Sequence, residues 1–507
     1  MNLRLIAWLL VAAAALGAGG FRAEQSPSPR THVVIVVDGL RPDYVTPALM
    51  PRLVRLGERG IVFGAHHAVY PTVTRVNAAT FATGVYPEAH GLLGNTVYVP
   101  AANPTNTLDT GSRANLETIA QADGQLLTAE SLGEILPRAG KTLLVVGAGT
   151  SGAAFLLNHT VGTGAIVHPE FTRPAPLGAR VLEALGAAPP QAMPNAAQNR
   201  YAVDAYVKIG LDQLHPDLTL MWISDPDHTA HSNGIGSTTT TRALALADAE
   251  IGRIEDTLQA RGLLDRTNLL VVSDHGFSTH TGAFRLQSFV EPFVKQLPDG
   301  SPDLVVAEGA IYLRGERDDS RLAAIVTALQ QRPEVGAVFT RPRTRGGAEG
   351  VVPGTLSFDV PRWNHRRSGD VLVSANWTAE ANEAGYAGTT GQSGVAGHGA
   401  TSPHDIHGVL ITAGPDFRRH ATSDVPTGNV DLAPTLLRLL GLPVPAAMTG
   451  RVIAEAFVNG PALSSLRVER SSETVRSADG GYTLTAHFSA TARHRYLDHT
   501  EVTHRTR

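Results

Sequence analysis

The sequence predicts an α/β fold with a mostly parallel central sheet and an inserted smaller lobe. Three short apolar runs rich in β-branched residues stop at a turn, at Val33–Val37, Leu218–Ser224 and Asn268–Ser273. Such runs are typical of strands that are buried on both faces of a parallel sheet. Helical spacing is clearest in Thr240–Arg261, and 507 residues with 43% hydrophobic content allow a sizeable core.

The N-terminus has the pattern of a secretory signal. Arg4 precedes the apolar segment Leu5–Ala18, which is too short for a comfortable membrane span. We therefore expect residues 1–23 to be a signal peptide, and the mature protein to be periplasmic or secreted without a stable membrane span. An uncleaved anchor stays open as an alternative. No cysteine follows the apolar segment, which excludes a lipoprotein.

The main domain is expected to span residues 31–460. Its first helix is expected at Leu53–Arg59, and a further strand at Lys141–Val146. The glycine-rich stretch that follows, Gly147–Phe155, lacks both a Walker lysine and the GxGxxG spacing, so a tight turn opening a helix is favoured over a phosphate cradle.

The second half of the chain predicts an insertion at about residues 280–395, followed by a return to the sheet. Residues 463–507 turn polar and β-like, which predicts a small C-terminal β extension or a tail. The further elements expected are strands at Leu304–Ala307, Ile311–Leu313, Ser368–Ser374 and Gly408–Thr412, and helices near Arg321–Gln331 and at Val430–Leu440.

Charge and cysteine content exclude several classes of protein. A net charge of −4 without a broad basic surface argues against a nucleic-acid-binding module, although it does not exclude nucleotide substrates. The absence of cysteine excludes disulfides and thiolate metal sites. The 20 histidines leave imidazole available as a metal ligand. Nothing in the sequence indicates the oligomeric state.

Metal-ligand residues recur in five short segments, most of them where a predicted strand ends. Because the carboxyl ends of parallel strands meet at one edge of a sheet, these side chains should converge there. Carboxylate oxygens together with imidazole nitrogens favour zinc or a similar transition metal over magnesium or calcium. The sequence therefore predicts a two-metal hydrolytic centre. Its candidate ligands are Asp38, Thr74, Asp227, His231, Asp274, His275 and His398.

The hydroxyl in this set is the candidate nucleophile. Coordination to a metal lowers the pKa of a threonine hydroxyl and supplies an alkoxide at neutral pH. Thr74 also precedes a segment that can form a helix, Asn77–Thr83, so backbone N–H groups would point at a bound anion.

The order of these motifs resembles the alkaline phosphatase superfamily, and most closely its nucleotide pyrophosphatase/phosphodiesterase branch. The resemblance spans roughly residues 32–440 and implies an alkaline-phosphatase-like α/β/α sandwich. The motifs that carry it, after the strand ending in Asp38-Gly39, are PTVT at Pro71–Thr74, TGVYPEAHG at Thr83–Gly91, Asn95, Pro226–His231, Ser273–Gly276 and His398-Gly399.

The resemblance also implies a role for each residue. Asn95, with the backbone N–H of Arg75, would contact the non-bridging phosphoryl oxygens. The implied enzyme is a zinc-dependent hydrolase that acts on a small phosphate ester or nucleotide through a phosphothreonine intermediate. One zinc would be held by Asp38, Thr74, Asp274 and His275, and the other by Asp227, His231 and His398.

Some residue assignments stay open. Arg75 stands where the diesterases carry an apolar residue, so it is either a surface charge or a phosphate clamp. His404 and His407 compete with His398, which is preferred because Gly399 allows close backbone approach. Asp225 and His228 are neighbouring alternatives to Asp227 and His231 as ligands of the second zinc.

Three other functions also stay open. The first is another enzyme of the same scaffold, namely a phosphomonoesterase, a phosphonoacetate-type hydrolase or a sulfate-ester hydrolase. Of these, the sulfate-ester hydrolase is least favoured, because the chain lacks cysteine and Thr74–Asn77 does not fit the sulfatase motif. The second is a metal-dependent binding protein without strong catalysis. The third is an interaction module that uses the C-terminal residues.

Overall fold

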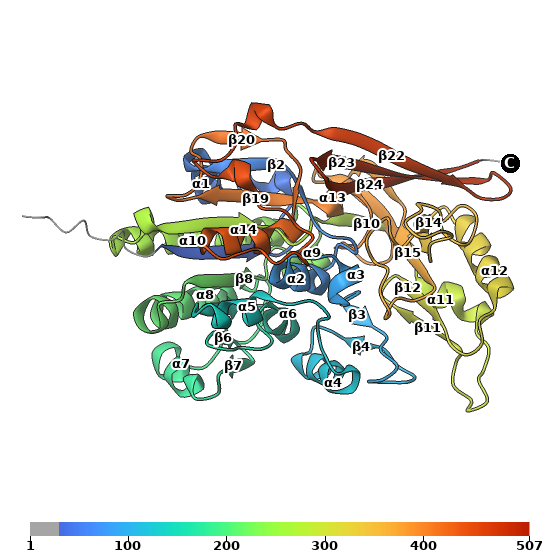
Figure 1. Ribbon diagram of the computed structural model, residues 1–507, viewed down its shortest axis with the longest axis horizontal. Coiled ribbons are helices and arrows are strands. Elements are labelled where there is room, and N and C mark those ends of the chain that lie inside the picture. Colours follow the sequence, from blue (N-terminus) through green and yellow to red (C-terminus); the bar gives the residue numbers. More distant parts are fainter. Residues whose placement is uncertain (1–29, 506–507) are drawn as a thin grey trace, which may run out of the picture.

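The computed structural model describes residues 30–505, and its centre is a twisted, mostly parallel sheet with helices on both faces (Figure 1). Only β19 and β7 run against the direction of the other strands. In order across the sheet the strands are β20 (Ala421–Ser423), β2 (Ile61–His67), β19 (His407–Ala413), β9 (Thr267–Val272), β1 (Thr31–Val37), β8 (Leu218–Ile223), β5 (Leu143–Gly147), β6 (Ala165–His168) and β7 (Phe171–Arg173), and β21 (Thr427–Gly428) also pairs with β2.

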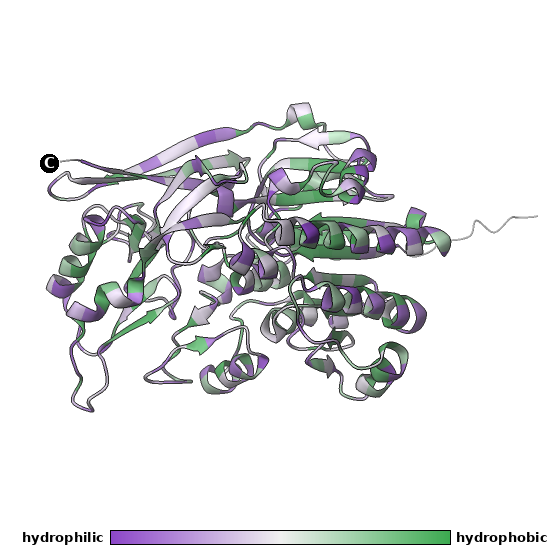
Figure 2. Cartoon of the chain, turned by 180° about the vertical axis from the view of Figure 1, so that it is seen from behind, coloured by the Kyte–Doolittle hydropathy of each residue, from purple (hydrophilic) through white to green (hydrophobic). Residues whose placement is uncertain are grey.

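Strand β1 shows why this sheet is buried on both sides. Val34 and Val36 belong to the hydrophobic core on one face, whereas Val33, Ile35 and Val37 belong to the core on the other. This alternation follows from the two-residue period of a strand. Both faces therefore need apolar side chains, and Figure 2 shows the central strands as predominantly hydrophobic.

Helices complete the two outer layers of the sandwich. Their apolar residues fall into the same two cores. One layer contains α1 (Pro51–Arg59), α7 (Leu177–Leu185), α8 (Ala196–Ala205) and α10 (Thr238–Ala260). The other contains α2 (Thr74–Thr83), α4 (Arg113–Asp123), α5 (Leu132–Arg138), α6 (Ser151–Leu157) and α14 (Leu432–Leu439). The predicted α/β/α fold is confirmed.

The glycine-rich stretch after β5 opens α6, where the Thr150 side chain caps the helix by accepting a bond from the N–H of Ala153. This geometry agrees with the tight turn favoured from the sequence.

A smaller lobe lies beside the sandwich (Figure 1). One of its sheets has β11 (Leu304–Ala307), β12 (Ala310–Leu313), β15 (Val371–Ala375), β13 (Val335–Thr340) and β14 (Leu356–Ser357), and α12 (Asp319–Gln330) packs on it. The other has β16 (Trp377–Ala381), β17 (Ala387–Gln392), β10 (Ser278–Phe284) and β18 (Ala396–Gly397). In the second sheet, β10 follows Asp274 and His275, and β18 precedes His398, so these two strands flank predicted ligands.

The C-terminal residues form an antiparallel sheet of β22 (Glu469–Arg476), β23 (Tyr482–Thr491) and β24 (His494–His504). Its buried residues Tyr482 and Phe488 share a hydrophobic cluster with Phe339 of the lobe. On the sandwich side, the hydroxyl of Tyr496 donates to Asp431 Oδ2 at 2.7 Å. The sheet therefore joins sandwich and lobe.

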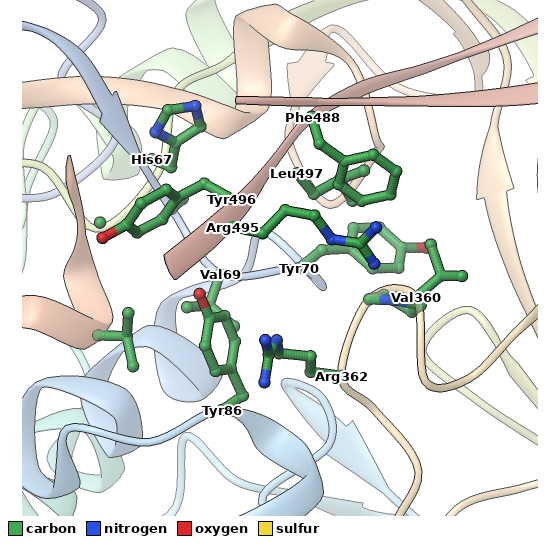
Figure 3. Close-up of a pocket in the computed structure, with 14 residues that line it drawn as sticks. His67, Val69, Tyr70, Tyr86, Val360, Arg362, Phe488, Arg495, Tyr496 and Leu497 are labelled. Carbon is green, nitrogen blue, oxygen red and sulfur yellow. The ribbon is translucent and has the colours of Figure 1, made fainter. Parts of the chain in front are cut away.

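A pocket marks this junction (Figure 3). It is lined by Tyr86 of the sandwich, Arg362 of the lobe, and Arg495 and Tyr496 of β24, among others. The aromatic and cationic side chains of three regions thus meet at one place.

The predicted signal peptide lies outside the described residues. Within residues 30–505, none of the helices combines the length and apolar content that crossing a bilayer requires. The boundaries proposed for the main domain, the insertion and the C-terminal extension stay predictions.

Candidate active site

The seven predicted ligands converge at the carboxyl edge of the central sheet. Asp38 directly follows β1, and Asp274 and His275 follow β9, which pairs with β1 in parallel. Asp227 begins α9 (Asp227–Asn233), just beyond β8 on the other side of β1. Thr74 is the first residue of α2, and His398 directly follows β18. The sheet therefore delivers the carboxylates, and loops bring the hydroxyl and the late histidine to them.

The first group of ligands surrounds one imidazole. His275 Nε2 lies 3.1 Å from Asp274 Oδ2 and 3.6 Å from Asp38 Oδ1. Thr74 Oγ1 lies 3.3 Å from the same nitrogen. All four side chains are buried. This is the group assigned to the first zinc from the sequence.

The second group surrounds one carboxylate. Asp227 Oδ2 lies 3.3 Å from both His231 Nε2 and His398 Nε2. The two groups touch, because the rings of His275 and His398 stack with their centroids 3.6 Å apart. His231 keeps 44% of its side chain exposed, so the centre is open to solvent on this side.

Each of the three histidines is oriented by its other ring nitrogen. A histidine that donates from Nδ1 to a carbonyl presents a lone pair on Nε2, which is the usual arrangement of a metal ligand. The acceptors for His275, His231 and His398 are the carbonyls of Gly276, Ala396 and Thr72, at 2.9, 3.1 and 2.8 Å. The three Nε2 atoms therefore face the carboxylates.

The residues fit two zinc-type cations. Asp38 Oδ1, Asp227 Oδ2 and Asp274 Oδ2 are buried, and none of them makes a hydrogen bond within residues 30–505. Zinc bonds of about 2.0–2.2 Å place two ligands of a tetrahedron about 3.3–3.6 Å apart. Three of the four N···O separations, at 3.3, 3.3 and 3.6 Å, fall in that range, and the fourth, between His275 and Asp274, is slightly shorter at 3.1 Å. Cations would satisfy the oxygens that the protein leaves unpaired.

The electrostatics also call for positive charge. Burial, together with Asp274 and Asp227, raises the pKa of Asp38 well above its usual range. Burial lowers the pKa of His275, but Asp274, Asp227 and the carbonyl of Gly276 together outweigh burial and raise this pKa to about 9. Without a compensating cation, burial and the charges of Asp274 and Asp227 therefore disfavour ionisation of Asp38.

Partners outside the ligand set hold the carboxylates in place, and the sequence analysis missed them. Trp222 Nε1 donates to Asp38 Oδ2 at 2.9 Å, and the N–H of Gly39 donates to Asp274 Oδ1 at 3.0 Å. Asn429 Nδ2 donates to the carbonyl of Asp274 at 2.8 Å. Trp222 lies in a predicted strand that ends at the site, so its contact with the site could have been inferred from the sequence. No sequence pattern indicated a role for Asn429.

Asn95 and Arg75 lie next to the nucleophile and bond to each other. The N–H of Arg75 donates to Asn95 Oδ1 at 3.0 Å. The guanidinium of Arg75 points towards Asp109, with Nη2 and Oδ1 3.8 Å apart, and only 15% of its side chain is exposed. Arg75 is therefore not an ordinary surface charge.

The competing residues have other partners. Asp225 accepts from the N–H of Asn195 at 2.8 Å and from the hydroxyl of Thr229 at 2.7 Å. His228 lies 3.3 Å from the amide of Gln191. The ring of His404 lies beside Trp377 and that of His407 beside His67. Asp227, His231 and His398 are thus the residues that the structure brings together.

Comparison with known proteins gives both sequence and fold relatives. The family model described as type I phosphodiesterase / nucleotide pyrophosphatase matches residues 32–400. Venom phosphodiesterase 2 of Crotalus adamanteus is 29% identical over 275 residues, which are 53% of this chain and 29% of that protein. Human ectonucleotide pyrophosphatase/phosphodiesterase family member 1 is 25% identical over 245 residues, 47% of this chain and 23% of that protein. The match thus spans less than a third of either relative.

Two solved structures share the fold. A variant of alkaline phosphatase PafA superposes with a TM-score of 0.65 at 16% identity, covering 85% of this chain and 99% of that one. An inactive variant of murine ectonucleotide pyrophosphatase / phosphodiesterase 5 in complex with AMP superposes with a TM-score of 0.56 at 19% identity, covering 82% and 96%.

Proposed function

Since the chain belongs to the type I phosphodiesterase / nucleotide pyrophosphatase family, we propose that it is a two-zinc phosphoric ester hydrolase. Its substrates are small phosphodiesters or nucleotide pyrophosphates, and Thr74 is its nucleophile. The observation that carries this proposal is the set of three buried, unpaired carboxylate oxygens, each beside an imidazole Nε2 at the spacing of zinc ligands.

The two groups of ligands divide the work. Asp38, Thr74, Asp274 and His275 would hold one zinc, and Asp227, His231 and His398 the other. When bound, the two ions lower the pKa of hydroxyl groups, neutralise the phosphoryl oxygens and polarise water.

The protein contributes position and hydrogen bonds to the reaction. Thr74 stands at the first turn of α2, where backbone N–H groups favour an anion. Its oxygen, having lost its proton, forms a bond to phosphorus while the bond to the leaving oxygen breaks, in line with the attack. Water then cleaves the phosphothreonine and restores the hydroxyl.

Asn95 and the N–H of Arg75 supply the donors for the phosphoryl oxygens. The Arg75 N–H is already bonded to Asn95. This bond must therefore open for the N–H to reach substrate, while the amide nitrogen of Asn95 is a donor that this bond does not use. The Asn95 amide nitrogen is therefore the donor that is available as it stands, and donors that are fixed before charge develops are the more effective.

The charge balance favours a diester. Two Zn²⁺ ions against three aspartates and a Thr74 alkoxide sum to about zero. Arg75 adds little, because its guanidinium faces the carboxylate of Asp109. A dianionic monoester needs additional positive charge, whereas a monoanionic diester needs less.

The experiment compares rates on chromogenic esters with zinc present. The unmodified protein is expected to cleave a phosphodiester faster than a phosphomonoester, and a sulfate ester slowest. Thr74→Ala should abolish turnover with zinc content retained, and Thr74→Ser should keep part of it. Phosphate trapped on another residue after acid quenching would refute the nucleophile. A monoester preference would favour the phosphomonoesterase alternative.

The proposal extends to location and organisation. The apolar segment Leu5–Ala18 supports export to the periplasm or the cell exterior. Residues 31–460 would form the catalytic domain with its insertion at about 280–395, and residues 463–507 a C-terminal extension. N-terminal sequencing of the mature protein, with cleavage expected within residues 18–23, tests the first part.

A further inference from the structure

A further cluster that contains histidines lies in the C-terminal sheet, away from the candidate ligands of the active site. His487 of β23 and His499 of β24 are directly opposite each other in the antiparallel register. Glu501 follows two residues after His499, so its side chain is on the same face. The three side chains therefore form a cross-strand group.

The distances in this group are those of metal ligands. Glu501 Oε1 lies 3.3 Å from His499 Nε2, and Oε2 lies 3.5 Å from His487 Nε2. These values fall within the separation of about 3.3–3.6 Å expected for two ligands of tetrahedral zinc. His487 Nε2 is buried and makes no hydrogen bond within residues 30–505. The two oxygens of one carboxylate thus each face an imidazole nitrogen, and the two imidazole rings stack with their centroids 4.5 Å apart.

A comparison within the molecule separates this group from an ordinary ion pair. His67, His407 and Asp498 also lie close together. There, however, His67 Nε2 is 2.7 Å from Asp498 Oδ1, which is the length of a charge-assisted hydrogen bond. The contacts of Glu501 are longer, at 3.3 and 3.5 Å, and the one with His499 is a long hydrogen bond that a cation would replace.

The local backbone holds the group in place. The register of β23 and β24 shifts by one residue directly beside His487, and such bulges re-aim side chains. Trp377 packs edge-on against the ring of His499, and its Nε1 donates to the carbonyl of Thr500 at 2.7 Å. Ordered neighbours reduce the entropy lost when a metal binds.

We propose that His487, His499 and Glu501 form a third zinc-type site, separate from the proposed catalytic pair. Two imidazoles and a carboxylate suit zinc, nickel or copper rather than magnesium or calcium. The fourth position is open to water, because 32%, 23% and 59% of the three side chains are exposed. The ion would cross-link β23 to β24 beside the contact with Trp377.

The test measures zinc bound per full-length chain by elemental analysis, after chelation and re-equilibration with Zn²⁺. Glu501→Gln and His499→Ala should each hold about one ion fewer than the unmodified chain. His504→Ala is the matched control, since His504 lies on the same strand and its buried Nε2 also lacks a hydrogen bond within the described residues. It should hold as much zinc as the unmodified chain.

A second measurement separates this site from the catalytic one. Zinc should slow amide hydrogen exchange in β23 and β24 of the Thr74→Ala protein, but not when Glu501→Gln is added. Ester hydrolysis by Glu501→Gln should stay within about twofold, as for a surface substitution. Equal zinc content in Glu501→Gln and the His504→Ala control would overturn the site, whatever the catalytic centre binds.

Discussion

His231 and His228 illustrate how neighbouring side chains of the same type acquire different roles. They stand three residues apart on α9, yet only His231 places Nε2 beside Asp227. The sequence analysis chose His231 from the family spacing, and the geometry agrees. Ligands that follow strands were predictable because the sheet edge gathers them. Hydrogen-bond partners such as Asn429 were not, because their role depends on contacts between distant segments.

Replacing His231 tests the second metal position. His231→Ala should lower zinc content by about one ion per chain and reduce diester hydrolysis by at least about 100-fold. His228→Ala, whose ring faces Gln191, is the control and should change neither quantity appreciably. Zinc content and rate are measured on the same samples. Equal losses in the two variants would show that the helix, rather than the ligand, had been disturbed.

The pair of Arg75 and Asp109 allows substrate charge to be tested. Asp109→Ala removes the carboxylate that faces the guanidinium, and should raise monoester hydrolysis relative to diester hydrolysis. The double variant with Arg75→Ala should lose that gain. The measurement is kcat/KM on matched chromogenic esters. A monoester preference already present in the unmodified protein, and lost in Arg75→Ala, would contradict the diesterase proposal.

Helices and strands transmit their positions to the centre through close backbone contacts. Asp227 at the start of α9 donates its N–H to the carbonyl of Asp38 at 3.1 Å. The lobe also reaches the Asn95 loop, because Glu308 accepts from the N–H of Thr96 and Trp363 Nε1 donates to the carbonyl of Leu93. Helical spacing predicted the long helix, and continuous β-branched apolar runs predicted the buried strands. Short strands such as β16 and β17 carry little pattern, since their residues are mostly small or polar, and they escaped prediction.

Gly39 is one of the close contacts at this centre. Its φ is +69°, and an added Cβ would lie 3.0 Å from Cβ of Asp227 and 3.1 Å from the ring of Phe277. Gly39→Ala should therefore displace Asp227 and weaken zinc binding as well as stability. Gly124→Ala is the control, because Gly124 has a similar φ of +81° and open space around it. It should cost only the backbone strain of about 1–2 kcal/mol. Zinc retention that matches in the two variants would count against this account.

The C-terminal sheet packs against both the lobe and the sandwich. Its aromatic residues fill a cluster of the lobe, and Tyr496 bonds to the sandwich. The sequence suggested only a β extension or a tail here, because the segment alternates polar and apolar residues without showing what they face. This packing indicates a structural role for residues that the sequence left open as an interaction module.

Substitutions of Tyr482 test how much the C-terminal sheet contributes to the stability of the protein. The Tyr482 ring is 1% exposed, and its hydroxyl donates to the carbonyl of Gly336 at 2.6 Å. Tyr482→Ala should lower the free energy of unfolding by about 3–5 kcal/mol. Tyr482→Phe should cost about 1–3 kcal/mol, because the carbonyl is left unpaired. Denaturant unfolding checks both. If removal of residues 463–507 left stability unchanged, the sheet would be an independent appendage.

The pairing of β2 with late strands sets the order in which the molecule can be completed. Residues 61–67 pair with β19, β20 and β21, which are synthesised much later, and the candidate metal centre is incomplete without His398. Contacts between segments so distant in sequence form slowly. A ribosome that stalls before residue 398 therefore releases a chain unable to assemble the full ligand set. The proposed second metal site is thereby completed only after most of the polypeptide has been made, which leaves incomplete products without the full set of candidate ligands.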